Sequence, residues 1–188
     1  MKSIIKMIDS LNDFVGKLCA YSILAMMGLV VYEVVTRRVF NAPTVWTFES
    51  ITMVYGFHFM MVIPYTLLHK GIVNVDLLFG KLSKKGQAIM DIITYAIFFF
   101  PFVGGILFKA VPYAANSWSH RETSWSVFAP PIYPFKTVIA VAFALLLLQG
   151  VSEILKRVLV LMNDEYIPIS PAAGENAEAG QAGEGGAA

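Results

Sequence analysis

Residues 37–49, RRVFNAPTVWTFE, separate two long apolar runs at residues 18–35 and 50–68. This stretch, which we call the elbow, combines two arginines and a glutamate with Pro43 and Trp46. An ionisable side chain costs about 2.5–3.5 kcal/mol at the centre of a bilayer, so the elbow is expected at a membrane surface. The pattern therefore predicts two membrane-spanning helices that are joined by a surface turn.

The composition indicates a membrane protein. Of the 188 residues, 57% are hydrophobic and 14% are charged, and the mean hydropathy of +0.65 is too high for an ordinary water-soluble domain. The Lys and Arg residues flank apolar segments and form no continuous stripe, so we expect membrane lipid and not nucleic acid as a partner. The single cysteine, Cys19, excludes an internal disulfide framework.

Four segments are long enough to span a membrane. A hydrocarbon core about 30 Å thick needs about 20 apolar residues in a helix that rises 1.5 Å per residue. We expect one membrane domain over residues 14–160, with helices at about 14–36, 48–69, 88–112 and 134–157. The sequence thus predicts an all-α integral membrane fold with four transmembrane helices and short interfacial amphipathic helices.

The N-terminal segment is predicted to lie at the membrane interface. In residues 1–13, Ile4, Ile5, Ile8 and Leu11 share one helical face and the charged residues lie elsewhere, which is typical of an amphipathic lead-in helix. A cleavable signal peptide is the alternative. The apolar run that follows is long for a signal peptide and has no clear small-residue exit.

Two further segments are expected outside the four helices. Residues 69–86 place leucines and lysines on different faces, which predicts a short helix along the membrane surface. Residues 161–188 are rich in Ala, Gly and Glu and have little apolar bulk, so we expect a disordered tail.

The Lys and Arg residues predict the orientation. Nine of them fall on the side of the four helices that holds both termini, and five fall on the other side. Positive charge accumulates on the cytoplasmic side of membrane proteins. Both termini are therefore expected in the cytoplasm.

Motifs for catalysis are missing from the sequence. It has no Walker loop, no Gly-x-Gly-x-x-Gly behind a strand, no metal-spaced Cys/His cluster and no nucleophile motif. We therefore expect no enzyme activity, no catalytic residue, no metal and no cofactor. A haem-bearing membrane anchor is an alternative, but His58 is expected near mid-membrane and His69 and His120 near opposite surfaces, whereas two axial ligands must flank one iron. His58 is expected to be a hydrogen-bonded side chain in a helix interface.

Glu33 is an acid near the end of the first helix. It precedes Arg37 by four residues, which predicts an ion pair on one helical face. An autonomous small exporter, with Glu33 as a cation-coupled binding carboxylate, is the functional alternative. Such exporters are shorter and carry their acid deeper in the membrane.

The elbow and a downstream motif resemble a known family. Arg38, Pro43, Trp46 and Glu49 occupy the places of an Arg-aromatic-x-x-x-Pro pattern and a Trp-x-x-Glu pattern in the small membrane subunit (DctQ type) of tripartite ATP-independent periplasmic (TRAP) transporters. Residues 73–78, VNVDLL, resemble the third motif of that family and contain Asp76. The similarity covers roughly residues 10 to 160. Two departures are Ile72, where a histidine is usual, and Phe48, where an acid is frequent.

The resemblance implies a supporting role in the bacterial inner membrane. In such systems a periplasmic binding protein captures an organic anion, such as a dicarboxylate, sugar acid or sulfonate, and a large permease subunit moves it with a sodium gradient. No substrate-binding residue is expected in the small subunit. The four helices show no evident internal polar network, so we expect the chain to be stable chiefly with its large partner.

Several residues are expected to matter for the structure or for contact with the large subunit, among them an arginine and a glutamate at the elbow. Pro43 interrupts the helix, so a guanidinium and a carboxylate can reach the same depth, and Arg38 is hypothesised to pair with Glu49 or with the large subunit. Trp46 is expected to anchor the turn at headgroup level. The full set of candidates is Glu33, Arg37, Arg38, Pro43, Trp46, Glu49 and Asp76.

Overall fold

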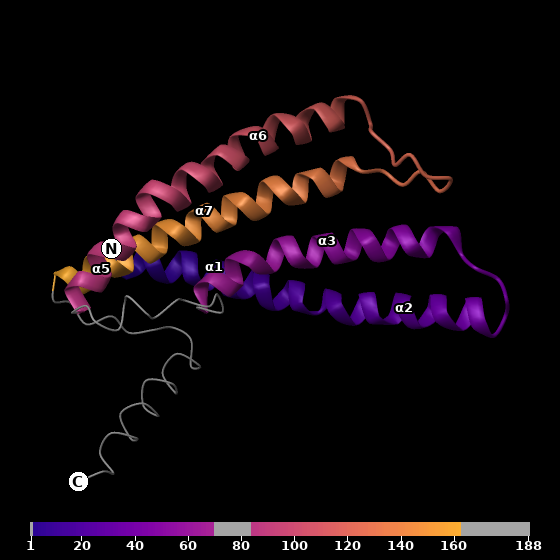
Figure 1. Cartoon of the computed structure of the whole chain (residues 1–188), viewed down its shortest axis with the longest axis horizontal. Coiled ribbons are helices and arrows are strands. Elements are labelled where there is room, and N and C mark those ends of the chain that lie inside the picture. The colour runs from indigo at the N-terminus through magenta and orange to yellow at the C-terminus, as the bar shows by residue number, and fades with distance from the viewer. Residues whose placement is uncertain (1, 70–83, 163–188) are drawn as a thin grey trace, which may run out of the picture.

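The computed structural model describes residues 2–69 and 84–162, which form long helices (Figure 1). These are α1 (Lys2–Ala20), α2 (Ser22–Arg38), α3 (Val45–Leu68), α5 (Lys84–Thr94), the π-helical turn η1 (Tyr95–Phe99), α6 (Phe100–Ser119) and α7 (Tyr133–Leu161). Within the described ranges, extended pairing is limited to one bridge between Thr123 and Pro131. Residues 2–38, 45–68, 85–119 and 133–161 are each long and apolar enough to cross a membrane. The all-α fold with four membrane-spanning helices is thereby confirmed.

Two helical stretches are longer than the sequence predicts. α1 continues past residue 13 without a break and meets α2 at a single non-helical residue, Tyr21. α6 continues past Pro112 to Ser119, because the Ser117 side chain and the Trp118 indole bond to residues beyond the helix end. Most of the predicted surface helix at 69–86, including Asp76, and most of the predicted tail at 161–188 lie outside the described residues.

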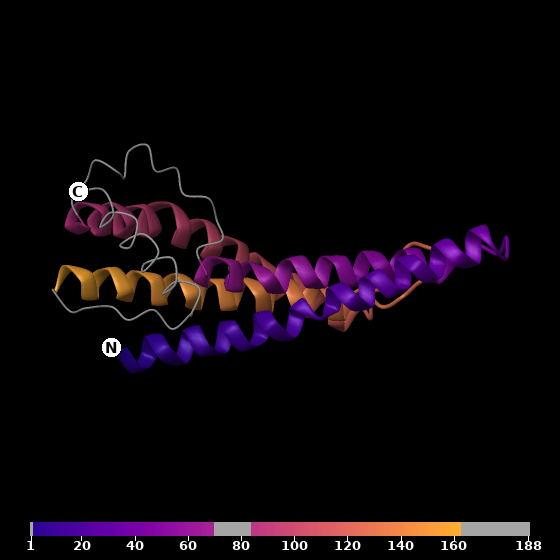
Figure 2. The same cartoon turned by 90° about the horizontal axis from the view of Figure 1, so that it is seen from below.

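The helices form two hairpins that meet along part of their length. α2 and α3 lie side by side, and so do α6 and α7, while α1 packs against both α3 and α7 (Figures 1 and 2). We call the end that carries the α2–α3 turn the elbow end. The end where α1 begins and α7 finishes is the terminal end.

Glycines form the closest helix contacts. At three crossings an aromatic ring lies so close to a glycine that a Cβ atom there would overlap it: Gly16 with Tyr65, Gly56 with Phe135, and Gly150 with Phe99. These contacts join α1 to α3, α3 to α7 and α7 to η1. Because a glycine lets a neighbouring helix approach closely, these positions set the spacing of the bundle.

α3 and α7 run parallel and in constant register. Phe135 packs on Gly56, and farther along Leu146 shares a small core with Leu67 and Val103. The spacing from Gly56 to Leu67 equals the spacing from Phe135 to Leu146. The two helices therefore keep the same register between these points.

This register shows that the two helices are staggered. Tyr133, where α7 begins, lies level with Val54, so about 14 Å of α3 extends beyond it toward the elbow end at 1.5 Å per residue. Leu68, where α3 ends, lies level with Leu147, so about 21 Å of α7 extends beyond it toward the terminal end. At the terminal end α7 packs against α1 and α5.

Candidate functional site

Six buried polar side chains of α1 and α7 meet at the terminal end. We call this group the terminal cluster; it consists of Asp9, Asn12, Gln149, Ser152, Glu153 and Lys156. Asn12 donates to Gln149 over 2.7 Å, and Ser152 donates to Asp9 over 2.7 Å. Gln149 also donates to Asp9, over 3.1 Å. Hydrogen bonds thus tie the middle of α1 to the second half of α7.

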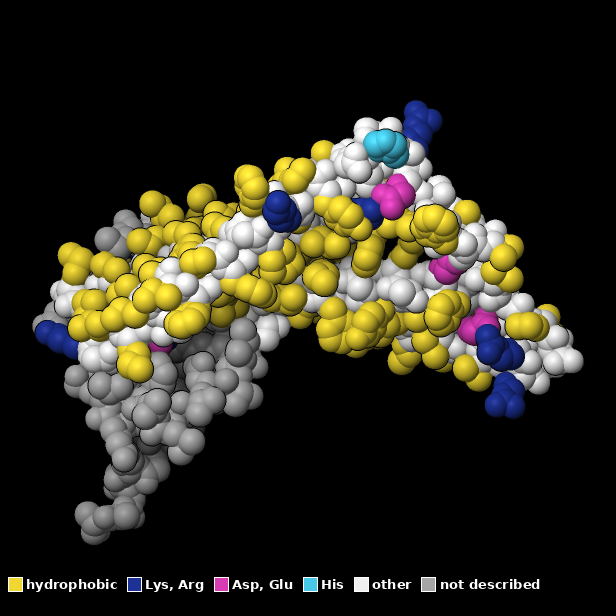
Figure 3. All heavy atoms as spheres, turned by 45° about the horizontal axis from the view of Figure 1, so that its top comes forward, with side chains coloured by type: hydrophobic (Ala, Val, Ile, Leu, Met, Phe, Trp, Pro, Cys, Tyr) yellow, Lys and Arg dark blue, Asp and Glu magenta, His cyan; other side chains and the backbone are white. Residues whose placement is uncertain are grey.

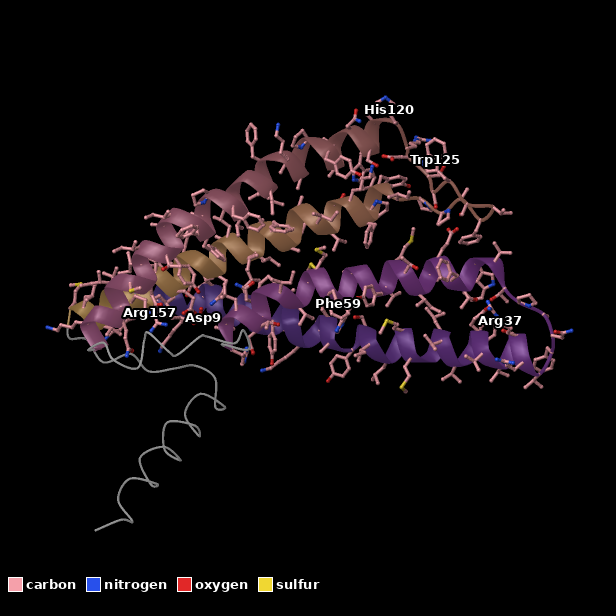
Figure 4. The ribbon with its side chains drawn as sticks, in the orientation of Figure 1. Asp9, Arg37, Phe59, His120, Trp125 and Arg157 are labelled. Atoms are coloured by element: carbon pink, nitrogen blue, oxygen red, sulfur yellow. The ribbon has the colours of Figure 1, made fainter. Side chains whose placement is uncertain are left out.

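The terminal cluster holds two carboxylates around one ammonium group. Lys156 Nζ lies 2.9 Å from Asp9 Oδ2 and 2.6 Å from Glu153 Oε1. Burying charges is tolerated when the ions are paired and their remaining acceptors are bonded. Ser152 and Gln149 meet that condition for Asp9 by donating to its other oxygen. Beside the cluster, Asp91 of α5 pairs with Arg157 at 2.8 Å (Figure 4).

The terminal cluster was not predicted from the sequence, and two expectations about this part of the chain are wrong. The charged residues of the lead-in were placed away from the packed face, yet Asp9 is 1% exposed. The four helices were expected to lack an internal polar network, yet one joins α1 to α7. A usable signal is present in α7, where Gln149, Glu153 and Lys156 recur at helical spacing and share one face.

At the elbow, Glu33 ties the end of α2 to the start of α3. One carboxylate oxygen accepts from Arg37 at 2.6 Å, which confirms the pair predicted from their spacing. The other oxygen accepts from the Thr44 hydroxyl, which also bonds to Thr47. Since both oxygens of Glu33 are engaged, the carboxylate is not free to bind a transported cation.

Trp46 and Pro43 lie on either side of the start of α3. The Trp46 ring lies 5.7 Å from the Tyr32 ring, centroid to centroid, so it packs on α2. Pro43 is exposed in the non-helical turn that separates Arg38 from Val45. The proline therefore stands where the chain leaves one helix and enters the next, as its fixed φ favours.

Arg38 and Glu49 do not pair with each other. Arg38 is exposed, and the described residues form no ion pair with it. Glu49 Oε2 is shielded from solvent and has no hydrogen-bond partner in the described part of the chain. Glu49 shares a face of α3 with Gly56, two turns away, but α7 begins only level with Val54 and does not reach Glu49.

His58 bridges α3 to the junction of α1 and α2. Its Nδ1 atom lies 2.9 Å from the Ser22 hydroxyl and 3.1 Å from the Cys19 carbonyl oxygen. The expected role as a hydrogen-bonded side chain in a helix interface is confirmed. His69 lies at the end of α3 beside Asp13, and His120 lies at the end of α6, so the structure does not bring the three histidines together (Figure 4).

The α6–α7 loop is fixed by an ion pair between Glu122 and Lys136. Glu122 accepts from Lys136 and, over 2.8 Å, from Ser117, and the Lys136 ammonium also lies 4.0 Å from the Tyr113 ring centroid. The hydrogen bonds from Lys136 and then Ser117 hold the pKa of Glu122 below its usual value. Trp125, at the far part of this loop, is fully exposed (Figure 4).

Lys109 occupies an unexpected place. The third helix was expected to end at about residue 112, shortly after Lys109, but α6 runs from Phe100 to Ser119 and Lys109 lies at its middle. Its side chain is exposed, and its ammonium lies 5.9 Å from the Phe108 ring centroid. Among the described residues, no acidic side chain pairs with it.

The chain matches one family model. The model described as tripartite ATP-independent periplasmic transporters, DctQ component, matches residues 26–160, which is more than half of the chain. The match covers the elbow, α3, α6 and most of α7. No curated protein and no solved structure gives a significant match.

Proposed function

Because the chain belongs to the DctQ component family of tripartite ATP-independent periplasmic transporters, we propose that it supports the large permease subunit of a sodium-driven, binding-protein-dependent importer. A small permease subunit of this family belongs to a tripartite system with a large permease and a substrate-binding protein. The proposed cargo is an organic anion, such as a dicarboxylate, a sugar acid or a sulfonate. The family match across the four-helix frame is the observation that carries this proposal.

The placement of charged side chains supports a scaffold and not a transport path. Within the described residues, the buried charges of the terminal cluster and of Glu33 are bonded inside the chain. They tie helices to one another, as a structural role requires. An ion or substrate path needs inward polar groups that remain available to the cargo.

The unpaired groups at the elbow support assembly with a second protein. Glu49 has a shielded carboxylate oxygen that receives no hydrogen bond within residues 2–69 and 84–162, and Arg38 has an exposed guanidinium. An unpaired buried carboxylate is costly, and a donor from a partner removes that cost. We propose that both residues contact the large subunit, with Trp46 holding the turn near headgroup level.

The proposed orientation places both termini in the cytoplasm of the bacterial cell, with the chain in the inner membrane. The Lys and Arg balance favours this orientation. Reporters fused after Lys85 and after Arg157 should read cytoplasmic, and a reporter fused after His120 should read periplasmic. A periplasmic reading after Lys85 would reverse the assignment.

Reconstitution tests the function directly. The chain and the large subunit, placed together in proteoliposomes with the binding protein encoded beside them, should import the anion that the binding protein holds, and only with an inward sodium gradient. The chain alone should import none. Uptake by the chain alone, with or without sodium, would overturn the scaffold proposal.

A further inference from the structure

α6 is the edge helix of the bundle, and its outer face is uncovered. It packs against α7 and continues from η1, and hydrophobic side chains cover much of its visible face (Figure 3). Phe102 is 68% exposed and Phe108 is 76% exposed. Gly105 lies one turn after Phe102, and a Cβ atom built on it would meet nothing within 4 Å. A large apolar face with a glycine notch is thus open on α6.

Lys109 continues this face one turn beyond Gly105. Residues 102, 105 and 109 recur at intervals of three and four, so they lie in one row along the helix. Lys109 therefore places a single cation within an otherwise apolar row.

The neighbouring helices fix the depth of Lys109. Gly104 lies beside Leu147, and Trp118 Nε1 donates to Thr137 over 2.7 Å. Lys109 lies between these two contacts, and so it is level with the apolar part of α7 between Thr137 and Leu147. The register of α7 on α3 places that part beside residues 58–68 of α3, inside its spanning segment.

At this depth an exposed ammonium group needs a partner. Ionisable residues inside membrane segments are costly when they face lipid, and they usually pair with another group. Lys109 is ten residues from Ser119, about 15 Å along the helix, which is farther than a lysine side chain extends toward the headgroups. By contrast, Lys136 and Lys156 are each paired with an acid of this chain.

We propose that the face formed by Phe102, Gly105 and Lys109 receives a membrane helix of the large permease subunit, whose acidic side chain pairs with Lys109. This inference rests on the proposed function and names where the partner binds. Gly105 allows the partner helix to approach closely. A second copy of this chain fits the face poorly, because a symmetric contact brings Lys109 of one copy toward Lys109 of the other.

A charge series at Lys109 tests the pairing. The tagged full chain is co-expressed with the large permease subunit of its transporter, and the amount of large subunit that co-purifies is measured. We expect Lys109→Arg to retain association, Lys109→Met to lower it several-fold, and Lys109→Glu to lower it at least tenfold. Lys85→Met, which removes an exposed lysine at the start of α5, should have no effect. Wild-type association with Lys109→Glu would overturn the inference.

A photo-crosslinker at position 102 tests the contact without altering the charge or filling the space beside Gly105. In an otherwise wild-type chain, p-benzoylphenylalanine in place of Phe102, an exposed aromatic side chain of the same face, should form a product that contains the large subunit. A product with a second copy of this chain, or with lipid alone, would overturn the inference even if Lys109→Glu failed to fold. If the wild-type chain does not co-purify with the large subunit, the proposed function itself fails. If it does co-purify, but the crosslinker forms no product with the large subunit and the Lys109 variants associate normally, only this inference fails.

Discussion

The terminal end and the elbow end hold their helices in different ways. At the terminal end, Lys156 and its buried partners join α1 to α7 across more than a hundred residues of sequence. At the elbow end, Glu33 bonds to Arg37 one turn away and to Thr44 in the turn that follows. The first arrangement closes the bundle, whereas the second only shapes one hairpin.

The terminal end is therefore expected to stabilise the folded chain, and the elbow end to take part in assembly with the large subunit. The terminal cluster pairs its own charged groups, and its one neutral acceptor without a donor among the described residues is Asn12 Oδ1. Among the described residues, a Glu49 oxygen at the elbow end has no donor, and Lys109 on the outer face of α6 has no acidic partner. We therefore expect variants at the terminal end to unfold the chain, and variants at the elbow to release the large subunit.

The largest effect on stability is expected for Lys156→Met. This change leaves Asp9 and Glu153 buried without their cation, and breaking a buried pair in this way costs about 3–5 kcal/mol. Thermal unfolding of the purified chain in detergent measures the loss. The control is Lys17→Met, because Lys17 pairs with Asp13 at an exposed site where an ion pair contributes about 0–1 kcal/mol. Equal losses in the two variants would mean that the terminal cluster does not hold the bundle.

A smaller loss is expected for Gly16→Ala. A Cβ atom there would overlap Tyr65 near its own Cβ, close to the α3 backbone, so the helices must separate. Overpacking of this kind costs about 1–3 kcal/mol. Gly28→Ala is the matched control, since its Cβ atom would meet nothing within 4 Å and alanine favours a helix. In the same unfolding assay, the melting temperature of Gly28→Ala should equal or exceed that of the wild type, and that of Gly16→Ala should be lower. A Gly16→Ala variant that melts above Gly28→Ala would show that the glycine contact does not set the helix spacing.

At the elbow, Glu49→Gln should affect assembly and not stability. The change removes an unpaired carboxylate, so the melting temperature of the isolated chain should stay the same or rise. Association with the large subunit should fall about tenfold, or about 1.4 kcal/mol, with no change in which anion is taken up. A drop in the melting temperature of the isolated chain would show that Glu49 has a partner within it.

A double-mutant cycle with Arg38→Ala and Glu49→Ala sharpens this result. Because no ion pair joins the two residues, their effects on association should add. A coupling energy above about 0.5 kcal/mol would mean that they act as one pair.

The smallest effect is expected from pH. The lowered pKa of Glu122 means that the folded chain holds its charged form more strongly than the unfolded chain does. The resulting stability is present above the ordinary glutamate pKa of 4.5 and is lost as the pH falls through the lower pKa of the folded chain. The melting temperature should therefore fall less between pH 7 and pH 4 in Glu122→Gln than in the wild type. Identical profiles would mean that the pair with Lys136 contributes nothing.

Local patterns in the sequence predicted the features that are formed within a single helix. Hydropathy located the four spans, and the spacing of Glu33 and Arg37 predicted their ion pair. The terminal cluster could not be predicted in the same way, because Asp9 meets Ser152 only when two helices far apart in sequence pack together. Lys109 was missed because the helix was expected to stop at about residue 112. The helix instead continues to Ser119, where the Ser117 and Trp118 side chains bond to residues beyond its end.

The most direct test of the supporting role is uptake measured in three sets of proteoliposomes, holding the chain alone, the large subunit alone, or both. Each set receives the same binding protein, the same anion and an inward sodium gradient. The account predicts full uptake with both proteins, much weaker uptake with the large subunit alone, and none with the chain alone. Sodium-dependent uptake by the chain alone, or equal uptake with and without it beside the large subunit, would contradict the account.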